Sequence, residues 1–226
     1  MLKRIAMGLV VATVLCITGF AQEDGSVKLG VGVKVGTPGA GIEIGMPFTE
    51  KIGGRLGFNY FTYDYDTTQE GVDYKADLTL LTVAGLIDWH PTGGSFRVSG
   101  GVLYNGNEVT GKGDFSATDS IKIGDNYYTG AEIGKLEAKV DFDDIAPYIG
   151  IGWDTSFGAE KQWGFICDLG LIYHGAPHVD LKSKGGTKSS DPGFLEDLRK
   201  EKKEIEDNID DFVIYPVATF GLLYRF

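Results

Sequence analysis

The sequence predicts an all-β protein: an eight-stranded antiparallel up-and-down transmembrane β-barrel with one short extracellular helix. Three observations support this prediction. Apolar and polar residues alternate in eight stretches, one side of those stretches is almost free of charge, and the connections alternate between short and long. The alternating stretches are 26–36, 40–47, 52–64, 75–90, 95–106, 137–154, 162–175 and 212–226.

The first 21 residues have the order of a secretory signal peptide. Two cations precede an apolar run over 5–20, and Gly19 and Ala21 fit the −3 and −1 positions of a cleavage site. An uncleaved membrane helix is the alternative, but the run is slightly short for one. Cys16 lies in a poor lipobox. We therefore expect residues 1–21 to be the signal peptide and residues 22–226 to form the barrel.

Charge and cysteine content exclude two classes of protein. The net charge is −11, and loss of the signal peptide with its two cations makes it −13. Nucleic acid is therefore excluded as a partner, because phosphate binding needs a basic surface. Only Cys167 remains after cleavage, so no internal disulfide can form.

The two sides of the predicted strands differ sharply. One side is apolar, as in Val31, Val33 and Val35 or Phe220, Leu222 and Tyr224. The other side carries charges and many glycines, which are Gly30, Gly32, Gly45, Gly57, Gly101, Gly150, Gly152, Gly170 and Gly221. A soluble lipocalin-like barrel would bury the apolar side, whereas a membrane barrel exposes it to lipid.

Three features favour the membrane arrangement. The tryptophans lie on the apolar side near strand ends, as an interfacial aromatic girdle requires; they are Trp89, Trp153 and Trp163. Glycine weakens a solvated strand but suits a crowded lumen. Short turns at 48–51, 91–94 and 155–161 alternate with longer connections at 65–74, 107–136 and 176–211, as periplasmic turns alternate with external loops.

The polar side predicts a charge network in the lumen. Its members are Lys28, Lys34, Glu43, Arg55, Asp88, Arg97, Asp154, Asp168 and Arg225. The interior of an eight-stranded barrel is only wide enough for side chains, and buried charges must pair. The near balance of signs therefore predicts ion pairs that close the lumen. A partly hydrated lumen with loose pairs is the alternative.

The one predicted helix lies at 191–211. Asp191 suits the N-cap and Pro192 the first helical position. The segment carries nine acidic and four basic residues. We expect a solvated cap rather than a binding motif, since no spacing of a defined calcium loop is present.

The end of the chain, TFGLLYRF, resembles the assembly signal of the small outer-membrane β-barrel proteins of Gram-negative bacteria. The segments APYIGIGW and WGFICDLGLIYHGAPHVDL also resemble an uncharacterised eight-stranded family of this kind, which is OmpW-like in general class. The resemblance implies that the barrel-assembly machinery reads Thr219, Gly221, Tyr224 and Phe226. It also implies location in the cell outer membrane.

No group of residues predicts catalysis or metal binding. The G-x-G patterns at 30–36 and 150–153 open no helix, so they are not nucleotide loops. His174, His178 and Asp180 share one side of a strand and its extension, but a metal would need further ligands nearby. Ser99 belongs to a different strand and depth, so no hydrolytic set forms around His174. We expect no catalytic residue, metal or cofactor.

These observations predict a non-enzymatic, monomeric integral outer-membrane protein with a structural or surface-interaction role. Its partners would be outer-membrane lipids, lipopolysaccharide and the barrel-assembly machinery. One alternative is a narrow channel for small molecules, hydrophobic ones among them, as in OmpW-type barrels. The other alternative is a lipid-modifying outer-membrane enzyme.

Overall fold

The computed structural model describes residues 29–69, 72–159 and 161–226. The predicted signal peptide at 1–21 and Lys28 of the predicted charge network lie outside these residues. Within the described residues, no helix is both long and apolar enough to cross a membrane.

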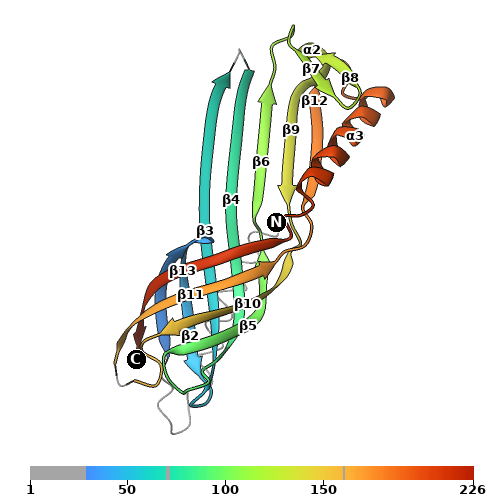
Figure 1. The fold of residues 1–226 in the computed structure, drawn as a ribbon. Coiled ribbons are helices and arrows are strands. Elements are labelled where there is room, and N and C mark those ends of the chain that lie inside the picture. The colour runs from blue at the N-terminus through green and yellow to red at the C-terminus, as the bar shows by residue number, and fades with distance from the viewer. Residues whose placement is uncertain (1–28, 70–71, 160) are drawn as a thin grey trace.

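Eight antiparallel strands form a closed barrel, which confirms the predicted fold class (Figure 1). In barrel order they are β1 (Gly30–Gly36), β2 (Gly39–Pro47), β3 (Ile52–Gln69), β4 (Val72–Trp89), β5 (Phe96–Asn105), β10 (Ile145–Asp154), β11 (Trp163–Tyr173) and β13 (Ile214–Arg225). The last strand pairs with the first from Gly30↔Arg225 to Gly36↔Thr219. This pairing removes the sheet edges, which lipid cannot hydrogen-bond.

Exposure along the strands confirms which side faces outward. On β1, Val33 is 59% exposed, whereas its neighbour Lys34 is 9% exposed. On β13, Phe220 is 57% exposed and Leu223 is 2% exposed. The apolar side therefore surrounds the barrel and the side with glycine and charge faces its axis. This is the arrangement of a barrel that spans a membrane.

The segments predicted as long external loops are largely folded. β3 and β4 are 18 residues each and continue beyond the barrel as one hairpin, so the connection predicted at 65–74 is mostly strand. β4 pairs with β5 in the barrel and with β6 (Glu108–Asp114) beyond it. β9 (Gly134–Asp141) and β12 (His178–Gly185) then complete an external sheet in the order β3–β4–β6–β9–β12.

The prediction of one strand over 137–154 is wrong. β9 ends at Asp141, and the barrel strand β10 begins at Ile145. Similar interruptions separate β5 from β6 and β11 from β12. At the first of these, the Asn107 side chain accepts a hydrogen bond from the Leu81 backbone at 2.9 Å, and Gly106 donates to the Leu81 carbonyl at 2.8 Å. Among the strands of the described residues, only β3 and β4 run unbroken from the barrel into the external sheet.

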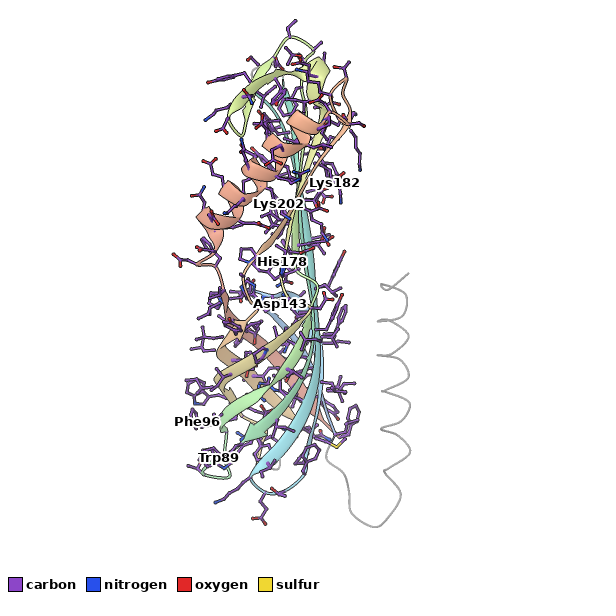
Figure 2. All side chains as sticks on the ribbon, turned by 90° about the vertical axis from the view of Figure 1, so that its right-hand side faces the viewer. Trp89, Phe96, Asp143, His178, Lys182 and Lys202 are labelled. Atoms are coloured by element: carbon purple, nitrogen blue, oxygen red, sulfur yellow. The ribbon has the colours of Figure 1, made fainter. Side chains whose placement is uncertain are left out.

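The predicted helix is confirmed as α3 (Pro192–Ile209), with Asp191 as its N-cap. The Asp191 side chain accepts from the Phe194 backbone at 3.0 Å. Smaller elements between β6 and β9 were not predicted: β7 (Ser120–Ile123), β8 (Asn126–Thr129) and α2 (Gly130–Ile133). α3 contacts β12 and β7 and lies on one side of the external sheet (Figure 2, where Lys202 marks the helix and Lys182 marks β12).

A small apolar core fixes α3, so the segment is more than a solvated cap. Its buried members are Ile123, Tyr128, Ile133, Phe194 and Leu198. Asp197 on the helix accepts a hydrogen bond from the Tyr128 hydroxyl at 2.6 Å and one from the Asn126 amide at 2.6 Å. The hydrogen bond to Asp197 raises the pKa of Tyr128 to about 12. The same bond lowers the pKa of Asp197.

Candidate functional site in the barrel lumen

One guanidinium group joins opposite walls of the lumen. Arg55 projects inward from β3 and donates to both carboxylate oxygens of Asp168 on β11, at 2.8 and 3.0 Å. Its Nε lies 3.0 Å from Asp88 on β4, and its Nη1 lies 3.3 Å from Glu43 on β2. β3 and β11 are four strands apart in a closed ring of eight, so the Arg55–Asp168 pair spans the barrel.

Two further cations complete this central layer. Arg97 on β5 lies 2.9 Å from Asp168 and 3.6 Å from Asp88. Lys34 on β1 lies 2.9 Å from Glu43. All of these side chains are buried. Pairing of buried charges offsets the large cost of removing each one from water.

A second layer closes the end of the barrel with the short turns, which is the predicted periplasmic end. Arg225 lies 2.5 Å from Asp154, and Ser156 donates to the same carboxylate. The Phe157 ring folds inward from the β10–β11 turn and stacks on His90, with ring centroids 3.4 Å apart. The Arg225 guanidinium lies 5.6 Å from the centre of the Phe157 ring. Side chains therefore block the lumen at this end.

The external half of the lumen contains an apolar cluster beside the hydrogen-bonded pair Asn59 and Thr82, and the alternation did not predict this cluster. Its buried cluster consists of Ala84, Leu86, Leu103, Ala146, Tyr148, Ile172 and Val217. A cavity of about 30 Å³ lies between this cluster and the central charges, and one of about 20 Å³ lies between the central and periplasmic layers. A single water needs about 10–15 Å³ of such space, so the smaller cavity has room for one or two waters and the larger for two or three.

Lumenal glycines make room for these layers. A Cβ on Gly152 would lie 2.5 Å from Asp168 Oδ1 and 3.0 Å from Arg97 Nε. A Cβ on Gly170 would lie 2.5 Å from Tyr148 Oη. Both positions therefore need glycine because neighbouring side chains occupy the space.

The predicted assembly-signal residues lie at the closing strand. They are Thr219, Gly221, Tyr224 and Phe226. Thr219 and Gly221 are buried in the lumen, and the rings of Tyr224 and Phe226 lie outside with centroids 5.0 Å apart. Their placement closes the barrel, and their role in assembly remains a prediction.

All three predicted girdle residues lie at the periplasmic ends of their strands. Their exposed fractions are 53% for Trp89, 41% for Trp153 and 65% for Trp163. Figure 2 shows Trp89 beside Phe96 at this rim. Exposed tyrosines, Tyr60 and Tyr173, lie toward the opposite ends of the barrel walls. The aromatic residues at this end are therefore tyrosines among aliphatic residues such as Ile145 and Ile214, and a search for tryptophan misses them.

The three residues considered for metal binding do not converge. His174 is buried and packs edge-on against Phe142 with ring centroids 4.0 Å apart. His178 is exposed, and Asp180 pairs with Lys182. No group of three His, Cys, Asp or Glu side chains in the described ranges is arranged to hold a metal ion.

Several lumen residues were missed by sequence reasoning. Ser99 donates to Asp88 at 2.5 Å and accepts from Arg55 at 3.0 Å, so it belongs to the central charged layer, of which it was not a predicted member. Its inward register, two residues after Arg97, is the signal that could have found it. His90, next to the turn predicted at 91–94, is also buried and was not among the predicted lumen residues. Phe157 gave no signal, because it belongs to a turn and enters the lumen from outside the strand pattern.

Comparison with known proteins supports the fold. No family model matches the sequence, and no curated protein matches it. CarO2 of Acinetobacter baumannii has a similar crystal structure, with 23% identity, a TM-score of 0.57, and coverage of 90% of this chain and 100% of that one. The crystal structure of CarO from the same organism is also similar, with 24% identity and a TM-score of 0.56. The match covers 90% of this chain and 100% of that one.

A major outer membrane protein from Thermus thermophilus is more distant. It has 16% identity and a TM-score of 0.46, and the match covers 89% of this chain and 100% of that one. At these identities the likeness to CarO2 and CarO concerns the fold alone. The chain is thus an outer-membrane-type β-barrel, and the more specific resemblance to OmpW-type barrels remains a prediction.

Proposed function

We propose that the protein is a non-enzymatic, non-conducting barrel of the Gram-negative outer membrane that holds its external sheet at the cell surface for interaction. The observation that carries this proposal is the ion pair between Arg55 and Asp168 across the lumen. A barrel that served as an open conduit would leave its axis free of such a pair.

The two ends of the lumen strengthen the proposal. Below the ion pairs, Phe157 and His90 stack across the periplasmic opening. Above them, the apolar cluster and the Asn59–Thr82 pair occupy the external half. The folded part of the molecule outside the barrel is by contrast large, and it presents its own surface. We infer that the barrel acts as a monomeric anchor among outer-membrane lipids and lipopolysaccharide.

Conductance across a planar lipid bilayer tests this proposal. We expect the wild-type protein to give no resolved channel steps in about 1 M KCl, where the Debye length is only about 3 Å. The double variant Arg55→Ala/Asp168→Ala removes one charge of each sign and widens the axis. Because Phe157 and the apolar cluster still occupy the two ends of the lumen, we expect this variant to remain closed as well, and a porin inserted under the same conditions shows that open barrels are detectable. Conductance by the wild type would overturn the closed-barrel proposal.

The narrow-channel alternative rests on the apolar lining of the external half of the lumen. Uptake of small apolar and polar solutes into proteoliposomes separates it from the anchor. Equal uptake with and without the protein supports the anchor. Faster uptake of the apolar solutes alone would favour the channel and would count against the anchor.

The enzyme alternative is tested on lipids. Purified protein is incubated with phospholipid and lipopolysaccharide, and the lipids are analysed by mass spectrometry. We expect no change in lipid mass with either the wild type or His174→Ala. A lipid product formed by the wild type and lost in His174→Ala would contradict the non-enzymatic role.

The proposed assembly signal has its own test. Phe226→Ala should lower the folded fraction of the protein in outer membranes of expressing cells, because the machinery would read the terminal aromatic residue. Phe165→Ala is the control, since Phe165 is also an exposed aromatic on the lipid side, 59% exposed. Equal folded fractions for the two variants would contradict a special role for Phe226.

A further inference from the structure

The external sheet has two edges, and they differ in their protection. At the β12 edge, α3 contacts the strand, and the Glu206 carboxylate accepts from the Val179 backbone at 3.2 Å. At the β3 edge, pairing with β2 ends at Ala40↔Tyr60. In the part of the chain that the structure describes, β4 is the only strand paired with β3 beyond that point. Figure 1 shows this part of β3 standing at the side of the sheet with no neighbour.

The alternating direction of the backbone hydrogen bonds along β3 shows which of its N–H and C=O groups lack a neighbouring strand. Phe48 donates to the Ile52 carbonyl at 2.8 Å on the β2 side, so even-numbered residues of β3 point their backbone groups toward β2. His90 donates to the Lys51 carbonyl at 2.7 Å on the β4 side, so odd-numbered residues point toward β4. Above Tyr60, the N–H and C=O groups of Thr62, Asp64 and Asp66 therefore face the open edge.

The side chains along this edge alternate in chemistry. Phe61, Tyr63 and Tyr65 continue the lumenal side of β3 upward and are 42%, 56% and 51% exposed. Next to them on β4, Leu78 is opposite Tyr63 in the register. These aromatic residues occupy the non-hydrogen-bonded positions of the open edge, where the side chains of an added strand come closest.

The opposite side of the edge is acidic. Asp64 is opposite Asp77 in the register, and Asp77 pairs with Lys112 at 3.2 Å. Like charges opposite one another are unfavourable, so a basic side chain on an added strand would balance Asp64.

We propose that the β3 edge over residues 62–67 binds an extended polypeptide segment that adds a strand to the external sheet. The segment carries apolar side chains on the side of Tyr63 and Tyr65 and Lys or Arg on the side of Asp64. This proposal rests on the proposed surface-interaction role and names the partner chemistry. Main-chain hydrogen bonds supply affinity in this mode, and alternate side chains supply specificity.

The difference in protection between the β12 and β3 edges favours the β3 edge as the binding edge. Unpaired edges attract other strands, and proteins usually cover them, bend them or place Lys or Pro on them. The β12 edge is covered and carries Lys182 and Lys184. The sequence of β3 from Phe61 to Gln69 contains neither Lys nor Pro.

The test uses a fluorescent ten-residue peptide of alternating Val and Lys, titrated into full-length protein in detergent micelles. Two control peptides are used. One has the same charge but proline in place of two central valines, which prevents strand pairing, and the other has Glu in place of Lys. We expect the Val–Lys peptide to bind about tenfold more tightly than either control, since strand pairing and charge are both required.

Three protein variants locate the site. Asp64→Pro removes an outward N–H without touching the β3–β4 ladder, and we expect it to weaken Val–Lys peptide binding about tenfold. Asp64→Asn keeps the N–H and should weaken binding less. Thr110→Pro places a proline on the interior strand β6. Circular dichroism of this variant shows how general damage to the sheet would appear. Equal affinity of wild type and Asp64→Pro, or equal binding of the proline-containing peptide, would overturn the proposal.

The oligomeric state is measured in the same samples by sedimentation. A wild-type monomer that binds the peptide supports the proposal. A dimer that Asp64→Pro converts to monomer would assign the edge to a second copy of the chain and overturn the peptide proposal. The bilayer measurement is independent, so a closed barrel that fails to bind the peptide refutes this inference without refuting the closed lumen.

Discussion

The barrel and the external sheet share β3 and β4, yet the polarity of the two faces reverses between them. On β3 the lumenal side carries Arg55 and Asn59 in the barrel and then Tyr63 in the external sheet. The opposite side carries Leu56 in the barrel and then Asp64. The solvent explains the reversal. Lipid surrounds the barrel, so charge must turn inward; water surrounds the external sheet, so charge turns outward.

The side chains on the two faces of the external sheet show the consequence of this reversal. Its outward side carries a ladder of ion pairs, such as Lys112–Asp77 at 3.2 Å, Lys135–Asp114 at 2.8 Å and Lys184–Glu137 at 2.9 Å. Its other side packs Leu136 and Leu181 against the core beneath α3. The external sheet is therefore folded as a water-soluble layer of helix on sheet, continuous with a membrane barrel.

Loss of a lumenal charge should have the largest effect. Arg55→Ala leaves Glu43 and Asp168 with fewer partners in a buried site, and we expect it to lower the free energy of unfolding by about 3–5 kcal/mol. Urea titration in lipid vesicles, followed by tryptophan fluorescence, measures this change.

The matched control is Lys112→Ala on the ion-pair ladder of the external sheet. Its pair with Asp77 is largely exposed, so its loss should change stability by no more than about 1 kcal/mol. Equal effects of the two substitutions would show that the lumen is hydrated like the surface, and the comparison would fail.

Loss of the Phe194 ring, which anchors α3, should have the second-largest effect. Phe194 is fully buried, and Phe194→Ala should weaken the docking of α3 by about 3 kcal/mol. We expect trypsin to cut faster after Arg199 and Lys200 while the barrel remains resistant. Leu195→Ala, at a neighbouring position outside the buried core that is 36% exposed, should leave cleavage unchanged. Simultaneous digestion of the barrel would mean that the two regions unfold as one unit.

A charge on the lipid side should cost slightly less. Ile149 is 65% exposed on β10, and Ile149→Arg should reduce stability in vesicles by about 2–3 kcal/mol because the charge meets hydrocarbon. Thr110→Arg on the water-facing side of β6 should change stability by no more than about 0.5 kcal/mol. A similar cost at both positions would contradict the assignment of different solvents to the two regions.

Acid should give the smallest effect, confined to the external sheet. The hydrogen bond from Tyr128 holds the pKa of Asp197 below its ordinary value of 3.8. The lowered pKa stabilises the folded state above pH 3.8, and this contribution is lost as the pH falls through the lowered value. Hydrogen exchange of α3 from about pH 6 to about pH 2.5 should show the loss, after correction for the intrinsic pH dependence of exchange. Asp197→Asn should show a smaller acid-dependent step, because Glu132 and Asp180, whose pKa values are also lowered, remain.

Much of the barrel could be predicted because membrane strands follow a period of two. The inward placement of Arg55, Asp88 and Asp168 follows from the positions of Leu56, Ile87 and Leu169 beside them. The external sheet was missed because its strands break the lipid pattern. The strand predicted over 52–64 stopped shortly after the polarity reverses at Tyr60, whereas β3 continues to Gln69. The strand predicted over 137–154 ran across 142–144, where β9 and β10 are separate.

The sequence by itself determined the closed barrel, which of its sides meets lipid, and the helix that begins after Asp191. Periodicity and capping are local properties, so they can be read without knowing what lies opposite. Only the tertiary structure decided that Arg55 meets Asp168 across the axis, that Phe157 enters the lumen, and that β3 has an open edge. Each of these depends on which strands become neighbours in space, and a pattern along one strand does not contain that information.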